Sequence, residues 1–232
     1  MPCILHIETS TDICSVALSQ DGACLDERIS KDGPSHAQLL PTFVDELISF
    51  ADNHAIPLDA ISVSSGPGSY TGLRIGVSTA KGICYGRNLP LISIPTLEVL
   101  CTPVLLYEDE IEEEALLCPM IDARRMEVYA AVYDRALQAL QPVHAEIINE
   151  NSYWEHLEKG PVYFFGNGAV KCKSKITHPN AHFLNDIRPI ARNMYPLAER
   201  KFAQQRFEDV AYFEPYYLKD FIAGTQKNLL IP

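Results

Sequence analysis

A glycine-rich turn stands between a short apolar segment at residues 60–63 and a run with helical periodicity that begins near residue 70. The turn and the first helical residues read SSGPGSYTGLRIG, from Ser64 to Gly76. Gly66 and Gly68 allow backbone angles that are closed to other residues, and they keep side chains away from the main chain. Because the first amides of a helix lack partners, such a turn can bind phosphate. It also fits a tight turn that only packs a helix onto a sheet, and both interpretations stay open.

Both helices predicted in this half carry features of a packing surface. Gly72 and Gly76 lie on one face of the helix predicted over residues 70–85, a spacing that lets a helix approach its neighbour closely. The helix predicted from about 35 to 52 has a wide apolar face, with apolar residues at 39, 43, 47 and 50 and again at 40, 44, 48 and 51. Ser35 is a suitable cap for this helix, and Pro41 fits a kinked or delayed first turn.

The order of predicted elements in the first half returns in the second. Strands are expected at 3–7, 13–18, 23–29, 60–63 and 89–94, with helices at 35–52, 70–85 and 96–105. The second half has strands at 115–121, 126–133 and 162–165, the last followed by the turn Gly166-Asn167-Gly168. An acidic residue ends the first strand of each half, at Glu8 and at Asp122.

This duplication predicts an α/β protein with two lobes, residues 1–105 and 106–232. The fold expected is the actin-like, sugar kinase and Hsp70 ATPase type, with a ribonuclease H-like core in each lobe and the ligand between the lobes. A helical pattern at 192–207 and an aromatic tail at 212–221 are expected to pack back across the lobe boundary.

Composition narrows the classes of function. A net charge of −11 and a pI near 5.0 argue against a protein that binds nucleic acid by itself, so a partner would have to supply any RNA contact. The seven cysteines include no C-x-x-C pair, which makes disulfides and a zinc knuckle unexpected. The chain has neither a long apolar run nor a basic-then-apolar leader, and a cytoplasmic location is expected.

Four segments together resemble the TsaB (YeaZ) family, bacterial partner proteins in threonylcarbamoyladenosine modification of tRNA. They are SSGPGSYTGLRIGVSTAKG from Ser64, ILHIETST from Ile4, SHAQLLP from Ser35 and IDARRMEVY from Ile121, in the family's order and spacing. A looser similarity at residues 214–218 extends to the C-terminal region, whereas residues 134–206 match poorly.

The resemblance implies a noncatalytic subunit that binds and activates a TsaD-type transferase, with a TsaE-type ATPase as a third member. In the family, the first two helices form a bundle with the matching helices of TsaD. The interface residues expected here are Leu39, Phe43, Leu47, Tyr70, Leu73, Arg74, Val77 and Lys81. The apolar members of this set could instead face the protein's own sheet. If they are exposed, the free protein is expected to form a homodimer through the same helices, and tRNA is contacted only through the complex.

Two loops could face a nucleotide as remnants of an ancestral site. One consists of Glu8, Thr9, Ser10 and Thr11, and the other contains Gly66 and Gly68. The alternative is that the polar side chains of residues 8–11 only satisfy the backbone of their own turn. In the second half, Arg124 or Arg125 could meet an anion in the cleft or could pair with Asp122 or Glu127.

No metal site and no cofactor are expected. TsaD-type enzymes carry an H-x-x-x-H metal pair, and the corresponding positions here are Thr96 and Leu100. His178 and His182 stand four apart, but Pro179 disfavours a shared helical face. The competing hypotheses are an enzyme, either a metal-dependent glycoprotease-like endopeptidase or a small-molecule kinase, and a free-standing nucleotide-binding regulator.

Overall fold

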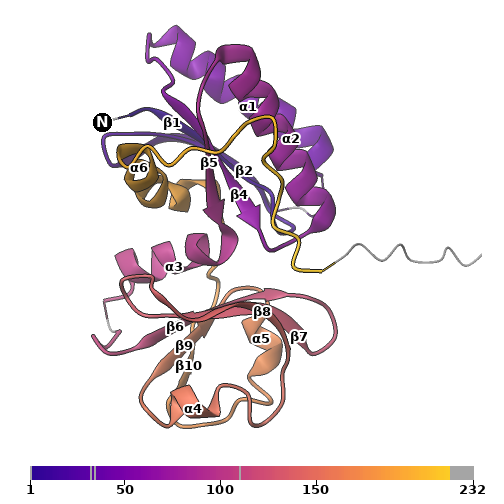
Figure 1. Cartoon of the computed structure of the whole chain (residues 1–232), viewed down its shortest axis with the longest axis vertical. Coiled ribbons are helices and arrows are strands. Elements are labelled where there is room, and N and C mark those ends of the chain that lie inside the picture. Colours follow the sequence, from indigo (N-terminus) through magenta and orange to yellow (C-terminus); the bar gives the residue numbers. More distant parts are fainter. Residues whose placement is uncertain (1, 32, 34, 110, 220–232) are drawn as a thin grey trace, which may run out of the picture.

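Two five-stranded mixed sheets form the centres of two lobes (Figure 1). The computed structural model of the chain describes residues 2–31, 33, 35–109 and 111–219. Asp220 and Phe221, the end of the predicted aromatic tail, lie outside the described residues.

The first lobe has the strand order β3-β2-β1-β4-β5. Strands β1, β2 and β3 are antiparallel neighbours, while β1, β4 and β5 run parallel. The bounds of its elements are β1 Ile4–Glu8, β2 Cys14–Gln20, β3 Ala23–Ser30, α1 His36–Asn53, β4 Ala60–Gly66, α2 Tyr70–Arg87, β5 Leu91–Pro95 and α3 Thr96–Tyr107.

The second lobe repeats this plan, with the order β10-β9-β6-β7-β8. The pairs β6–β7 and β7–β8 are antiparallel, and the pairs β6–β9 and β9–β10 are parallel. The duplication predicted from the sequence is therefore confirmed by the topology. The elements are β6 Leu116–Asp122, β7 Glu127–Tyr133, β8 Ala139–Ile147, α4 Trp154–Leu157, β9 Val162–Phe165, α5 Ala169–Cys172 and β10 Ala181–Phe183, followed by η1 Ala191–Met194 and α6 Tyr195–Ala203.

The first sheet is buried on both faces. Helices α1 and α2 cover one face, where Leu47 and Val77 pack against Leu5 and Ile7 of β1. Short η1 and helix α6 cover the other face, with Met194 and Leu197 in one cluster with strand residues that include Ile4. Figure 1 shows α6 on the opposite side of the first sheet from α1 and α2, with α3 between the two sheets.

The predicted lobe boundary needs a correction. The division at residue 105 assigned all of residues 106–232 to the second lobe. After β10, however, η1 and α6 return to the first sheet, and the Ala191 amide donates to Ser15 Oγ at 2.9 Å. Packing of the helical pattern at 192–207 back across the lobe boundary was expected from the sequence, but the apolar stripe on α6 could not place the helix, because it would fit either lobe.

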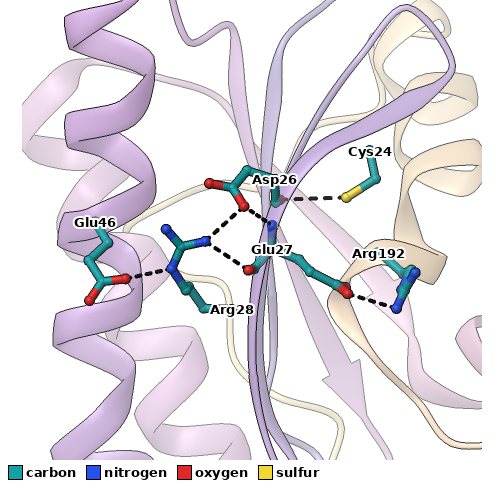
Figure 2. A network of polar contacts seen from close by, with 6 residues as sticks. All are labelled: Cys24, Asp26, Glu27, Arg28, Glu46 and Arg192. Carbon is teal, nitrogen blue, oxygen red and sulfur yellow. Dashed lines mark hydrogen bonds and ion pairs between the residues drawn. The ribbon is translucent and has the colours of Figure 1, made fainter.

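Polar contacts hold strand β3 between helix α1 and η1 (Figure 2). Arg28 Nε donates to Glu46 Oε2 of α1 at 2.5 Å, and Arg192 Nη2 of η1 pairs with Glu27 Oε1 at 2.7 Å. Both pairs are partly exposed, so each stabilises the fold by about 1 kcal/mol at most.

Local differences from the predicted elements have simple causes. Ser35 takes the cap position of α1, but its side chain makes no capping hydrogen bond, and α1 continues through Pro41. Strand β8 falls in the poorly matching region and was not predicted, because residues such as Gln141 and Pro142 weaken its alternating pattern. No helix in the described part of the chain is long and apolar enough to cross a membrane.

Candidate functional site

Glu8 ends β1 with a fully buried carboxylate. The Ser10 amide donates to Glu8 Oε1 at 2.5 Å, whereas Glu8 Oε2 has no partner among the described residues. Burial raises the pKa of Glu8, and the hydroxyl and amide of Ser10 and the hydroxyl of Ser64 oppose this effect. The Ser10, Ser64 and Thr96 hydroxyls are also buried without a hydrogen bond of good geometry to a described residue. Buried polar groups of this kind destabilise a fold and gather at functional sites.

His6, two residues earlier on the same face of β1, is satisfied in contrast. Its Nδ1 lies 2.6 Å from Ser62 Oγ and its Nε2 lies 2.7 Å from Ser19 Oγ. Burial lowers the pKa of His6 to about 3, so the imidazole is neutral at physiological pH. His6 is a structural link across β2, β1 and β4, and the unsatisfied polar groups begin only at Glu8.

The glycine turn between β4 and α2 is filled by the protein's own backbone. A Cβ at Gly68 would lie 2.3 Å from the Ser10 carbonyl oxygen, and one at Gly72 would lie 2.1 Å from the Thr9 carbonyl oxygen. At Gly66, where φ is +106°, a Cβ would lie 2.6 Å from the Tyr216 carbonyl oxygen. These distances are far below any real carbon–oxygen contact, which explains why glycine occupies all three positions.

The protein's own backbone thus fills the space beside this turn, while the nucleotide-facing role expected for the two loops stays a prediction. Ser69 donates its amide to the Ser10 carbonyl at 2.6 Å, and the Gly72 amide donates to Ser69 Oγ at 3.2 Å. The Ser69 and Gly72 amides are therefore not free to bind a phosphate. Thr9, Ser10 and Thr11 are buried as well, with Thr9 Oγ1 donating to the Gly72 carbonyl at 2.8 Å. Of the two interpretations of the motif, close packing is the one that the geometry supports.

The second lobe uses the same device. A Cβ at Gly166 would lie 2.3 Å from the Met120 carbonyl oxygen, and one at Gly168 would lie 2.8 Å from the Ile121 carbonyl carbon. Asp122, the counterpart of Glu8, is exposed instead of buried, and its amide donates to Asn167 Oδ1 at 3.0 Å. The two lobes thus share a backbone motif but differ in the environment of the acidic residue.

The predicted interface residues divide into three groups. Leu47, Leu73 and Val77 are at most 3% exposed and lie beneath the helices in the protein's own core, so they cannot act as surface contacts. This part of the interface prediction is corrected; the helical pattern could not tell which half of a wide apolar stripe faces the sheet. Leu39 and Phe43 are half-buried against the same core. The others, Tyr70, Arg74 and Lys81, are half-buried or exposed on α2.

Of an exposed stripe on α2, the sequence prediction named only Arg74. Arg74, Ser78, Gly82 and Tyr85 follow one another at helical spacing and are all exposed, with Tyr85 87% exposed. A Cβ at Gly82 or Gly86 would meet nothing within 4 Å. The spacing of these residues is visible in the sequence, but their exposure is not.

A segment that we call the C-terminal strap, residues 208–219, runs from the edge of the first sheet along α2. It begins at Glu208, whose amide donates to the Leu91 carbonyl of β5 at 2.9 Å. Lys81 Nζ then donates to the Ala211 carbonyl at 3.2 Å and to the Phe213 carbonyl at 2.9 Å. The strap is therefore bonded to α2 through Lys81.

The strap continues over the glycine turn and reaches the second lobe. The Tyr216 amide donates to the Ser65 carbonyl at 2.7 Å, and the Tyr217 ring lies 4.7 Å from the Tyr70 ring. Lys219 Nζ pairs with Glu127 Oε2 of β7 at 2.5 Å. A cavity of about 320 Å³ remains between α2 and the strap, with Arg74, Ser78 and Glu214 among its lining residues.

The positions compared with a metal pair are not ligands. Thr96 and Leu100 are both fully buried in α3. Within the residues that the structure describes, no group of three or more His, Cys, Asp or Glu side chains could hold a metal ion. His36 is buried, with Nε2 3.1 Å from the Ile13 carbonyl oxygen.

Comparison with known sequences identifies the family. The model of the family described as "TsaD: tRNA N6-adenosine threonylcarbamoyltransferase" matches residues 30–223. The tRNA threonylcarbamoyladenosine biosynthesis protein TsaB of Escherichia coli is 28% identical over 236 residues, covering 95% of this chain and 96% of that protein. The TsaB protein of Bacillus subtilis is 30% identical over 176 residues, covering 75% of this chain and 74% of that protein.

Solved structures agree with this assignment. YeaZ from Pseudomonas aeruginosa superimposes with a TM-score of 0.76 at 25% sequence identity, covering 94% of this chain and all of that one (100%). A second structure from Pseudomonas aeruginosa, described as similar to peptidase YEAZ, has a TM-score of 0.79 at 24% identity and supports the same fold. With its duplicated α/β sheets, the fold is the two-lobed actin-like type that the sequence predicted. The chain therefore belongs to the TsaB (YeaZ) family.

Proposed function

We propose that the protein is a noncatalytic subunit that binds and activates a TsaD-type transferase in threonylcarbamoyladenosine modification of tRNA. The observation that carries the proposal is a contrast within one motif. The glycines of the motif at residues 64–76 pack inside the protein, whereas the outer stripe of α2, the helix that follows the turn, stays exposed. The names of the TsaB relatives support a role in tRNA threonylcarbamoyladenosine biosynthesis, and a TsaE-type ATPase is the expected third member of the complex.

The outer stripe of α2 suits docking by a helix. Gly82 and Gly86 leave open space at the helix surface, so another helix can approach closely. Tyr85, 87% exposed beside them, offers a large side chain with a polar end, the type that is enriched at protein interfaces. Helix α1 packs beside α2 on the same face of the first sheet, and its half-buried Leu39 and Phe43 add apolar surface there.

Helices with such a stripe also pack against copies of themselves. Without a transferase, the same surface is therefore expected to form a homodimer about a two-fold axis. Because both assemblies use one surface, transferase and second copy should compete, and adding transferase should convert homodimer into heterodimer.

The test uses Gly82→Gln. Since the position is exposed and a side chain there meets nothing, the variant should fold at least as well as the parent, and glutamine favours helix more than glycine does. At a helix–helix contact the added side chain blocks close approach. We expect binding to a TsaD-type transferase, measured by calorimetry and size-exclusion chromatography, to weaken at least about tenfold, or roughly 1.4 kcal/mol.

Gly160→Gln is the matched control, because a Cβ at Gly160 in the second lobe also meets nothing within 4 Å. It should bind the transferase as the parent does. Parent-like binding by Gly82→Gln would contradict the docking surface, and turnover of threonylcarbamoyl transfer by the isolated chain would contradict the noncatalytic role. Leu73→Asp is unsuitable as a probe, because Leu73 is 1% exposed and the charge would unfold the protein.

A further inference from the structure

The turn between β6 and β7 holds two arginines in an unfavourable backbone conformation. Arg124 has φ of 73° and Arg125 has φ of 51°, and no other consecutive non-glycine pair among the described residues has positive φ at both positions. The Glu127 amide donates to the Arg124 carbonyl at 3.1 Å, which closes a β-turn. Glycine and asparagine adopt positive φ at much lower cost than arginine. Backbone strain of this kind is a reason to look for a role of the side chains.

The arginine side chains make no polar contacts with the described part of the chain. Both residues are exposed, and neither guanidinium makes a hydrogen bond or ion pair to any residue that the structure describes. Among the described residues, Arg124 contacts an acidic residue through its backbone, where its amide donates to Asp122 Oδ1 at 2.8 Å. Pairing of Arg124 or Arg125 with Asp122 or Glu127, one of the two alternatives open from the sequence, is therefore not what the structure contains.

The two carboxylates that flank the turn are paired with lysines instead. Lys171 of α5 pairs with Asp122 and also donates to the Glu127 carbonyl at 2.6 Å. Lys219 of the C-terminal strap pairs with Glu127 Oε2 at 2.5 Å. Three separate segments thus bring four cations to a place with two carboxylates, in a chain with a net charge of −11. Within the described part of the chain, no carboxylate pairs with either arginine side chain.

We infer that this turn is a phosphate-binding site, in which the guanidinium groups of Arg124 and Arg125 contact the oxyanion. A guanidinium presents a planar fork of donors that matches phosphate oxygens in bidentate geometry. The phosphate could belong to an RNA backbone or to a free phosphate or nucleotide. Exposure of both side chains fits a phosphate on a large ligand, and the RNA source rests on the proposed function, in which tRNA is present in the complex.

The experiment compares Arg124→Gln/Arg125→Gln with Arg124→Gly/Arg125→Gly. The glycine variant relieves the positive-φ strain, so its melting temperature should equal or exceed that of the parent. Both variants should lose phosphate binding. The control is Arg200→Gln/Arg206→Gln, which removes the same charge from two exposed arginines at the end of α6 and just beyond it.

Two arms separate the sources of phosphate. In the first arm, tRNA binding to the complex with a TsaD-type transferase is measured over a range of salt concentrations. If the RNA backbone is the source, both turn variants should bind roughly tenfold more weakly, and the slope of log K against log salt should fall by about 1.5 to 2. In the second arm, inorganic phosphate is titrated into the free protein while arginine side-chain NMR signals are recorded. Shifts at Arg124 and Arg125 that saturate in the parent and are absent from the control region support a site for small phosphates.

Each result decides the proposal. A loss of binding that is confined to the turn variants, with transferase binding unchanged, supports the site. The arm in which the loss occurs identifies the source of the phosphate. If the turn variants match the control in both arms, the proposal is overturned. Loss of transferase binding with both phosphate arms unchanged would also overturn it, since the turn would then be a protein contact. If the parent does not bind the transferase at all, the proposed function fails, while the titration with inorganic phosphate still tests the site.

Discussion

At the scale of single residues, Glu8 is the clearest departure from what stability alone would select. A fully buried carboxylate with one oxygen that lacks a hydrogen-bond partner among the described residues is costly in the folded state. Its neighbour His6 shows that this part of the sheet can satisfy a polar side chain fully, because both of its ring nitrogens have hydroxyl partners. The same sheet thus leaves one oxygen of Glu8 without a hydrogen-bond partner in the described part of the chain.

We expect Glu8→Gln to stabilise the protein at pH 8. Burial raises the pKa of Glu8 above its ordinary value of 4.5, so the folded state keeps a proton that the unfolded state has released. The free energy of unfolding therefore falls as pH rises from 4.5 through the raised pKa. Glutamine cannot ionise, so the variant does not lose free energy of unfolding over this pH range. The gain should be on the order of 1 kcal/mol, or roughly 2–4 °C in Tm, and should vanish below pH 4.5.

Glu155→Gln serves as the control, since Glu155 is exposed on the short α4 helix of the second lobe. Thermal melts at several pH values should show no pH-dependent difference between this control and the parent. A Glu8→Gln protein that is less stable than the parent at pH 8 would mean that the ionised carboxylate is stabilised by a group outside the described residues.

At the scale of elements, the C-terminal strap changes the meaning of the glycine motif. The strap passes so close to the end of β4 that the Tyr216 carbonyl occupies the place of a side chain at Gly66. Hydrogen bonds with Leu91, Lys81 and Ser65 hold the strap, which has no helix or strand of its own. One ring contact, an ion pair with Glu127 and the packing of Val210 and Phe213 against the first core add to them. Its attachment therefore depends on a few named contacts, each of which can be removed.

Gly66→Ala should release the strap. Its Cβ would lie 2.6 Å from the Tyr216 carbonyl oxygen, a backbone atom that can move only if the strap moves. Gly33→Ala is a matched control, because Gly33 also has positive φ, +94°, but a Cβ there meets nothing within 4 Å. Both variants carry the conformational cost of positive φ, about 1 kcal/mol, and only the first has the clash.

The measurement is native-state hydrogen exchange, with limited proteolysis at residues 209–217 as a second readout. Exchange at the Tyr216 amide, which is bonded to the Ser65 carbonyl, should accelerate at least about tenfold in Gly66→Ala. It should stay at the parent rate in Gly33→Ala. Equal protection in both variants would show that the strap does not depend on the close approach at Gly66.

At the scale of the whole molecule, the two lobes are joined by more than a linker. Helix α3 packs its buried side chains against β6 and the second core, while η1, α6 and the C-terminal strap return to the first lobe. Three chain segments therefore connect the lobes: the segment after α3, the return into η1, and the strap with its Lys219–Glu127 pair. Lobes connected in this way should unfold together.

Leu47→Ala tests this coupling. Leu47 is fully buried in the first lobe, and the truncation should cost about 2–5 kcal/mol. Trp154, the single tryptophan, lies in α4 of the second lobe, so its fluorescence reports on that lobe, while far-ultraviolet circular dichroism reports on the whole chain. Both signals should shift to lower denaturant concentration by the same amount. A fluorescence midpoint that stays at the parent value would mean that the lobes unfold independently.

The duplicated order of elements could be predicted from the sequence because it depends on local residue patterns. Apolar strands ending in Glu8 and Asp122, each followed by a hairpin partner and a later glycine turn, indicate both lobes without any tertiary information. The motif at 64–76 was also recognised as important. The sequence did not determine whether the turn binds a phosphate or only packs closely, since both a bound phosphate and a neighbouring carbonyl group require the same glycines.

Local sequence thus determined most elements of the first lobe and the repeat of the plan, because periodicity and turn chemistry act over a few residues, and its four motif segments indicated the family. Only tertiary structure decided which side of each helix is open. Leu73 and Tyr85 lie on one helix, yet one is buried and the other 87% exposed. The same holds for the strap over Gly66 and for the lysines that neutralise Asp122 and Glu127. These contacts join residues far apart in the chain, and long-range proximity leaves no local pattern.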